Sequence, residues 1–141
     1  MFQMKKVFVL VFISISFLSL KMYAQNDSVD TTGIFTGTPD SLPYFQNSQQ
    51  DWLRFLQKNL KVTVPANNGA PAGKYQPVIS FIVNEDGSLS DIQIEKDDKF
   101  KSGEEALRVM KLRQSWYPAI YQGKPVKYRF HQKFIFVVTE N

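Results

Sequence analysis

The sequence predicts an α+β fold, a two-layer sandwich in the order α-β-β-α-β, with a three-stranded antiparallel sheet and two helices on one face. Three observations predict it. Two strand-like runs meet at Asp86-Gly87, a long alternating run closes the chain, and two stretches with helical periodicity lie before and after the first pair of runs. Two strands alone are only marginally stable, so the third strand and the helices are needed as cover.

The composition is that of one globular domain with extensions. The 141-residue chain is 43% hydrophobic, which suffices for a packed core. It has no Cys, which excludes disulfides, thiol catalysis, thiolate metal sites and a lipid-modified N-terminal Cys. Lys5, Lys6 and Lys21 are three of the 17 basic residues, so 14 basic and 13 acidic residues remain from residue 25 onward. This balance argues against nucleic acid as a partner, because phosphate binding needs clustered positive charge.

The first 24 residues are typical of an export signal. Lys5 and Lys6 precede an apolar run of 14 residues, Val7 to Leu20, and Met22-Tyr23-Ala24 resembles a cleavage site. As a helix this run spans about 21 Å, less than the bilayer core of about 30 Å. We therefore expect a cleaved signal peptide over residues 1–24 and a periplasmic protein. An uncleaved N-terminal anchor in the inner membrane is the alternative.

Residues 25–47 are polar, contain Gly and Pro, and show no period, so we expect a flexible linker. We expect occasional docking on the domain, with a dedicated contact as the alternative, for four large apolar side chains that depart from this pattern: Ile34, Phe35, Tyr44 and Phe45. The domain itself is predicted to cover residues 48–141.

The first helix is predicted from Ser48 to Leu60. Ser48 and Asp51 have the spacing of a capping box, in which the Ser side chain accepts from the backbone N–H three residues later. The apolar residues recur at helical spacing and form one stripe, expected to be core: Trp52, Phe55, Leu56 and Leu60. Residues 66–73 are then predicted to form a loop.

The hairpin is predicted from Val78 to Lys96. Asp86-Gly87 tolerates the positive φ of a tight reversal. Side chains of a strand alternate between faces, so each run has one mostly apolar face.

The second helix is predicted to begin at Ser102, with Ser102 and Glu105 as a second capping box. Ala106, Val109 and Met110 form its apolar stripe, and Pro118 marks the end of the helical region.

The last strand is predicted as one continuous run from Val126 to Val138. Its even-numbered residues are apolar except for Gln132, so we expect this face to meet the core. Its first four odd-numbered residues are basic or His and are expected to face solvent: Lys127, Arg129, His131 and Lys133.

No group of residues predicts catalysis. His131 is the only His and has no Ser or Cys beside it, so we interpret it as a solvated or packing residue. The acidic pairs Glu85-Asp86 and Asp97-Asp98 lie in predicted turns, where acidic residues are common. We therefore expect neither an enzyme nor a metal or cofactor site, and no small-molecule substrate.

Four blocks in order resemble the TonB C-terminal domain family, in the version common in Bacteroidetes. They are W-L-R-F-L-Q-K-N-L-K from Trp52, S-F-I-V-N-E-D-G-S-L-S-D-I-Q-I from Ser80, E-E-A-L-R-V-M-K-L from Glu104 followed by W-Y-P-A from Trp116, and G-K-P-V-K-Y-R-F from Gly123. The resemblance extends roughly from residue 48 to residue 138.

The resemblance implies a protein-binding module linked to energy-coupled transport across the outer membrane. Domains of this family bind an extended segment of an outer-membrane receptor, which adds as a strand at the edge of the sheet. The resemblance places this partner-binding edge on eight residues: Val126, Lys127, Tyr128, Arg129, Phe130, His131, Gln132 and Lys133. The basic side chains of this edge either protect it from aggregation or favour an acidic partner.

The chain departs from the family pattern at three places. The segment before the first helix is Phe45-Gln46-Asn47-Ser48 where F-P-G-G is common, Lys133 stands where Pro is common, and the spacer of 25–47 is short. Two alternatives to the receptor-binding module therefore stay open. One is a structural domain that self-associates into a homodimer through its last strand. The other is an energy transducer with an uncleaved anchor.

Overall fold

A computed structural model describes residues 29–45, 48–97, 99–112 and 115–140 of the chain. The predicted signal peptide, residues 1–24, lies outside these ranges. The predicted linker lies partly within them.

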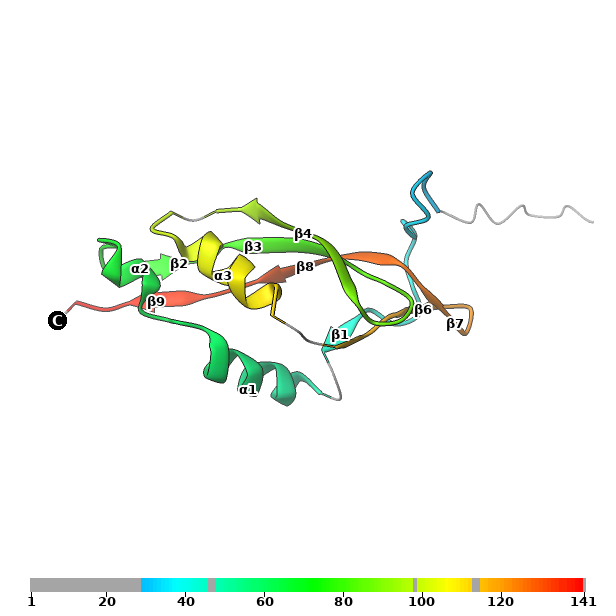
Figure 1. Cartoon of the computed structure of the whole chain (residues 1–141), viewed down its shortest axis with the longest axis horizontal. Coiled ribbons are helices and arrows are strands. Elements are labelled where there is room, and N and C mark those ends of the chain that lie inside the picture. Colours follow the sequence, from blue (N-terminus) through cyan, green and yellow to red (C-terminus); the bar gives the residue numbers. More distant parts are fainter. Residues whose placement is uncertain (1–28, 46–47, 98, 113–114, 141) are drawn as a thin grey trace, which may run out of the picture.

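The described residues form the predicted α+β fold around a three-stranded antiparallel sheet, in the order β4-β3-β8 (Figure 1). Strand β3 (Val78–Val83) is central, and it pairs with β4 (Leu89–Lys96) and with β8 (Tyr128–Lys133). Five of the six β3 side chains are buried, as befits the central strand, whose two faces are both covered.

The predicted hairpin is confirmed. The backbone N–H of Gly87 donates to Asn84 at 2.9 Å, and Asp86 accepts from the N–H and hydroxyl of Ser88. Gly87 has a φ of +81°, which a residue with a side chain adopts only at a cost. Its carbonyl also accepts from the N–H of Trp116 at 3.1 Å, which fixes the tip of the hairpin to the segment after the second helix.

Two main helices cover the sheet. Helix α1 (Gln49–Asn59) begins as predicted, with Ser48 accepting from the N–H of Asp51 at 3.2 Å. Helix α3 (Ser102–Met110) packs on β3 and β4, whereas α1 lies beyond the β8 side of the sheet (Figure 1). A short helix, α2 (Val64–Asn67), occupies part of the stretch between α1 and the hairpin, where only a loop is predicted.

The capping prediction for the second helix is wrong. Lys101, in a left-handed conformation, is the N-cap of α3, and the Ser102 hydroxyl donates to the carbonyl of Lys99 at 2.8 Å. Glu105 turns away from its own N-terminus and accepts from the N–H of Lys61 at 2.8 Å and from the Arg108 guanidinium. This buried carboxylate, 5% exposed, thus connects α3 to the end of α1.

The last run is three strands rather than one. It changes neighbours twice: β7 (Lys124–Val126) pairs with β6 (Ala119–Tyr121), β8 pairs with β3, and β9 (Phe136–Val138) pairs with β2 (Gly73–Tyr75). The predicted alternation still holds along it. Phe134 and Phe136 are buried, whereas Ile135 and Val137 are more than half exposed despite being apolar.

Residues 29–45, within the predicted linker, pack against the domain. We call residues 29–41 the arm. Its Phe35 is 4% exposed, and its ring packs against that of Tyr121 with 4.5 Å between the ring centroids. Strand β1 (Tyr44–Phe45) pairs with β5 (Trp116–Tyr117), and Phe45 joins an aromatic core whose other members include Trp52, Phe81, Trp116, Phe134 and Phe136.

Candidate partner-binding edge

Strand β8 is an edge of the three-stranded sheet, and its hydrogen-bonding pattern can be followed from its two ends. The N–H of Phe134 donates to Pro77, on the β3 side, at 3.0 Å. The carbonyl of Lys127 accepts from the backbone N–H of Phe35 at 2.8 Å, on the side of β8 that faces away from β3. Main-chain groups alternate along an antiparallel strand, so the even-numbered residues of β8 bond to β3 and the odd-numbered ones point outward.

The arm occupies the first part of this outer edge. Phe35 forms a parallel bridge with Tyr128, in addition to its bond to Lys127. Beyond this bridge, β8 has no second strand neighbour among the described residues, and the main chains of His131 and Lys133 point outward. The part of β8 without a second strand neighbour is therefore shorter than the predicted partner-binding edge.

The predicted edge residues fall into three groups. Val126 is the last residue of β7, and Lys127 lies between strands with its carbonyl taken by the arm. The other six form β8. Phe130 and Gln132 face the core side with Tyr128, whereas Arg129, His131 and Lys133 lie on the opposite face.

Two of the basic side chains on β8 already have acidic partners on β4. Arg129 pairs with Asp91 and His131 with Glu95, each at 2.5 Å. The Arg129 guanidinium, by donating to Asp91, lowers the pKa of that carboxyl. These pairs cross over β3 and help to cover Ser80 and Ile82, which are 8% and 9% exposed on this otherwise open face. Among the described residues, Lys133 has no carboxylate partner within 4.0 Å.

The opposite edge of the sheet is less suited to accept a strand. In β4 the pairing with β3 shifts register between Ser80 and Ile82, and Asp91 has a φ of +46°. A bulge of this kind bends an edge strand and interrupts its row of hydrogen-bonding groups. The pairing of β3 with β8 shows no such shift.

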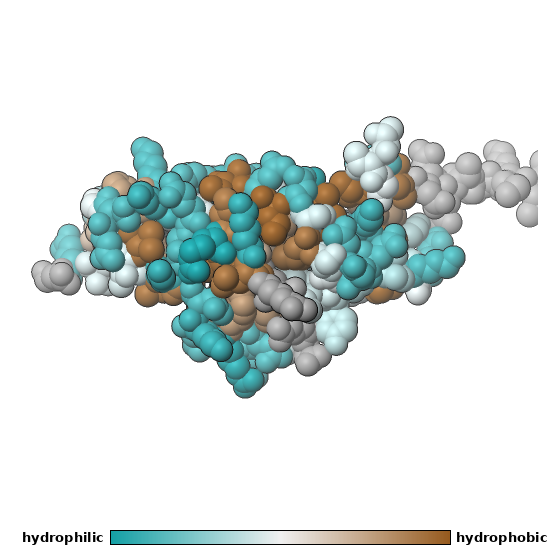
Figure 2. Space-filling model, in the orientation of Figure 1, coloured by the Kyte–Doolittle hydropathy of each residue, from teal (hydrophilic) through white to brown (hydrophobic). Residues whose placement is uncertain are grey.

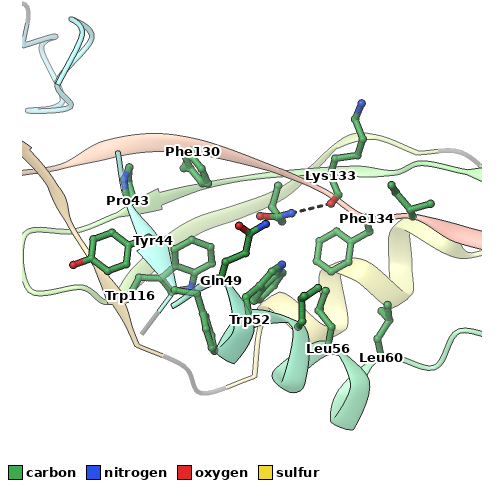
Figure 3. Close-up of a pocket in the computed structure, with 14 residues that line it drawn as sticks. Pro43, Tyr44, Gln49, Trp52, Leu56, Leu60, Trp116, Phe130, Lys133 and Phe134 are labelled. Atoms are coloured by element: carbon green, nitrogen blue, oxygen red, sulfur yellow. Dashed lines mark hydrogen bonds between the residues drawn. The ribbon is translucent and has the colours of Figure 1, made fainter. Parts of the chain in front are cut away.

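An apolar groove lies between α1 and β8 (Figure 3). Its volume is about 610 Å³. Trp52 and Leu56 of α1 line one side, Phe130 of β8 lines the other, and Tyr44 closes one end (Figure 3). Gln132 of β8 also lines the groove. Leu53, Tyr44 and Ile135, which also line it, are each about half exposed. The outer surface of α1, at the bottom of Figure 2, is by contrast hydrophilic.

Gln132 both lines the groove and bonds to a main-chain group of the outer edge. Its side-chain amide donates to the carbonyl of Lys133 at 2.8 Å (Figure 3). The sequence predicts Gln132 as part of the edge. It is the one polar residue among the even-numbered residues of the last run, and this exception was the signal that could have singled it out. The groove was missed, because the position of α1 beside β8 is a tertiary feature that periodicity does not encode.

The described residues contain no group of three or more His, Cys, Asp or Glu side chains placed to hold a metal ion. Within the same ranges, no helix has the length and apolar character required to cross a membrane.

Comparison with known proteins identifies one family. The profile of the Gram-negative bacterial TonB protein C-terminal family matches residues 76–138, from just before β3 to the end of β9. The resemblance predicted from the sequence is thus confirmed for this region. Domains of this family are non-catalytic interaction domains of the cell envelope. The search of curated proteins found no match to the chain.

Proposed function

Because residues 76–138 belong to the TonB C-terminal family, we propose that this chain is a periplasmic module that binds an extended segment of an outer-membrane TonB-dependent receptor. The segment adds as a strand along the outer edge of β8. The observation that carries this proposal is the row of outward main-chain groups at His131 and Lys133, beside the point where the arm already bonds to β8.

The arm supports strand addition because it uses the same edge. Phe35 pairs with β8 through main-chain atoms, as an incoming segment would, and the edge continues past it for several residues. Main-chain bonds then supply affinity, and the side chains on either face supply selectivity.

Residues 1–24 are, in this proposal, a signal peptide that is removed on export. N-terminal sequencing of the exported protein tests this point. A mature chain that starts at Gln25 supports the periplasmic module, whereas a chain that retains Lys5 and Lys6 supports an anchored energy transducer.

A pull-down from outer-membrane extract tests the binding. His131→Pro removes an outward N–H, and His131→Ala removes only the side chain and its contact with Glu95. We choose His131 because Arg129 adjoins the residue that the arm bridges. β-Barrel receptors are expected with the full chain and with His131→Ala, but not with His131→Pro. Equal recovery with all three contradicts strand addition at this edge.

A second copy of the chain is the other candidate occupant of the edge. The half-exposed Ile135 and Val137, next to β8, favour this alternative. Analytical ultracentrifugation distinguishes the two: a dimer that His131→Pro dissociates supports self-association, and a monomer supports the receptor-binding module.

A further inference from the structure

The groove between α1 and β8 is uncharged along most of its length. Of its lining residues, only Lys133 carries a charge, and it lies at the margin. The floor is aromatic, with Trp52, Trp116 and Phe134 all less than 10% exposed. Such a surface favours apolar side chains, because burial of a charge without a partner is costly.

The geometry of β8 determines which side chains of an added strand reach the groove. Residues directly opposite each other in paired strands point to the same face of the sheet. Phe130 and Gln132 line the groove, so the residues of the added segment opposite them also face it. The residues opposite Arg129, His131 and Lys133 face the other side.

The arm follows the same rule at the first part of the edge. Phe35 is opposite Tyr128, on the core-facing side of β8, and it is apolar and 4% exposed. Its ring packs on Tyr121. Phe35 is thus an example of an apolar side chain that is buried on the core-facing side of β8 when a segment lies along this edge.

We infer that the groove is the side-chain recognition site of the added segment, and that it selects a segment with apolar side chains at two alternate positions, those opposite Phe130 and Gln132. This inference rests on the proposed strand addition. The positions in between tolerate polar residues, because Arg129 and His131 already pair with Asp91 and Glu95. An acidic residue is favoured only at the position nearest Lys133.

Two peptides of identical composition test the inference. In one, Ser-Val-Ser-Val-Ser, the valines alternate, and in the other, Ser-Ser-Val-Val-Ser, they are adjacent. Both carry blocked ends and a fluorophore, and binding to the purified full chain is measured by fluorescence anisotropy. The alternating peptide places both valines in the groove and the other peptide only one, so we expect the alternating peptide to bind about tenfold more tightly, because burial of a further Val side chain is favourable.

Variants separate the groove from the edge. Leu53→Glu puts a charge on the groove rim at a side chain that is 52% exposed, so the fold should tolerate it. Val62→Glu is the matched control, at 59% exposure and outside the groove. Leu53→Glu is expected to remove the preference for the alternating peptide, and Val62→Glu to preserve it.

The outcomes distinguish the inference from the proposed function. If both peptides bind equally and His131→Pro weakens both, strand addition stands and groove selection is overturned. If His131→Pro changes neither affinity, the proposed edge is overturned as well. Absence of binding by both peptides also contradicts groove selection.

Discussion

The backbone N–H of Phe35 donates to the carbonyl of Lys127 at 2.8 Å, on the outer side of the last strand region. Residues 92 positions apart in the sequence thus meet at the edge that the family resemblance assigns to a partner. The arm makes an isolated β-bridge to this edge and limits how much of the edge is open.

Replacement of Phe35 tests whether the arm is held by its aromatic side chain. Phe35→Ala removes the buried contact with Tyr121, so the arm should detach while the sheet stays folded. Hydrogen exchange measures this directly: the amide of residue 35 should lose protection, and that of Phe81, in the central strand, should keep it. Val29→Ala, at a side chain 49% exposed, is the control. Retained protection at residue 35 would show that main-chain bonds alone hold the arm.

Removal of the buried carboxylate tests the connection between α3 and α1. Glu105→Gln keeps an acceptor for the N–H of Lys61 but loses the charge opposite Arg108. We expect a loss of about 1–3 kcal/mol in the free energy of unfolding, measured by denaturant titration. Glu104→Gln, one residue earlier and exposed, should cost much less.

The same carboxylate predicts an acid dependence of stability. Burial raises the pKa of Glu105, but the bonds from Arg108 and Lys61 outweigh it, and the pKa lies below its ordinary value of 4.5. Its folded-state pKa is therefore below its unfolded one, so its contribution is present above pH 4.5 and is lost as the pH falls through the folded-state value. The free energy of unfolding of the native chain should fall more steeply below pH 4.5 than that of Glu105→Gln. Parallel pH profiles would contradict this assignment.

The hairpin tip provides a matched pair of glycines. Gly87 and Gly123 both have positive φ, at +81° and +74°. A Cβ at Gly87 would lie 2.0 Å from the Trp116 carbonyl oxygen, whereas one at Gly123 meets nothing within 4 Å. Gly123→Ala should cost only the backbone strain of about 1–2 kcal/mol, and Gly87→Ala a further 1–3 kcal/mol or so from the clash. Equal losses by thermal or chemical denaturation would show that the contact with Trp116 is unimportant.

Gln132 is expected to oppose partner binding in the free chain. Its amide holds the Lys133 carbonyl, an outward-facing acceptor that an added strand would use. Gln132→Leu frees this carbonyl and extends the apolar groove, so binding of the alternating valine peptide should tighten several-fold. Gln132→Glu, which places a charge beside the groove, should weaken it. Tightening by both variants would contradict the account of the groove.

Much of the fold was predictable because it rests on local chemistry. The hairpin at Asp86-Gly87, the Ser48 cap and the alternation along residues 126–138 each depend on neighbours in the sequence. The roles of Glu105 and Phe35 depend on Lys61 and Lys127, which only the tertiary fold brings close. The division of the last run into β7, β8 and β9 has the same origin, since each part takes a different neighbour.

In the candidate site, too, the features set by neighbours in the sequence were predictable, and those set by the tertiary fold were not. The alternation of basic and apolar residues placed Arg129, His131 and Lys133 on one face and Phe130 on the other, as the structure has them. It gave no sign that Asp91 and Glu95 pair with Arg129 and His131, because the sequence of one strand does not reveal which residues of β4 and β8 lie opposite each other across β3. For the same reason it did not reveal the groove beside α1.

Photo-crosslinking of the full chain in living cells tests whether β8 receives an extended segment of a receptor. A photoreactive residue replaces His131 on the β8 edge or, as control, Gln93 on the bulged β4 strand. Mass spectrometry of the product identifies the crosslinked segment. We expect position 131, and not position 93, to crosslink to a periplasm-facing segment of an outer-membrane receptor. Crosslinking at both positions alike, or from position 131 only to another copy of the chain, would contradict this expectation.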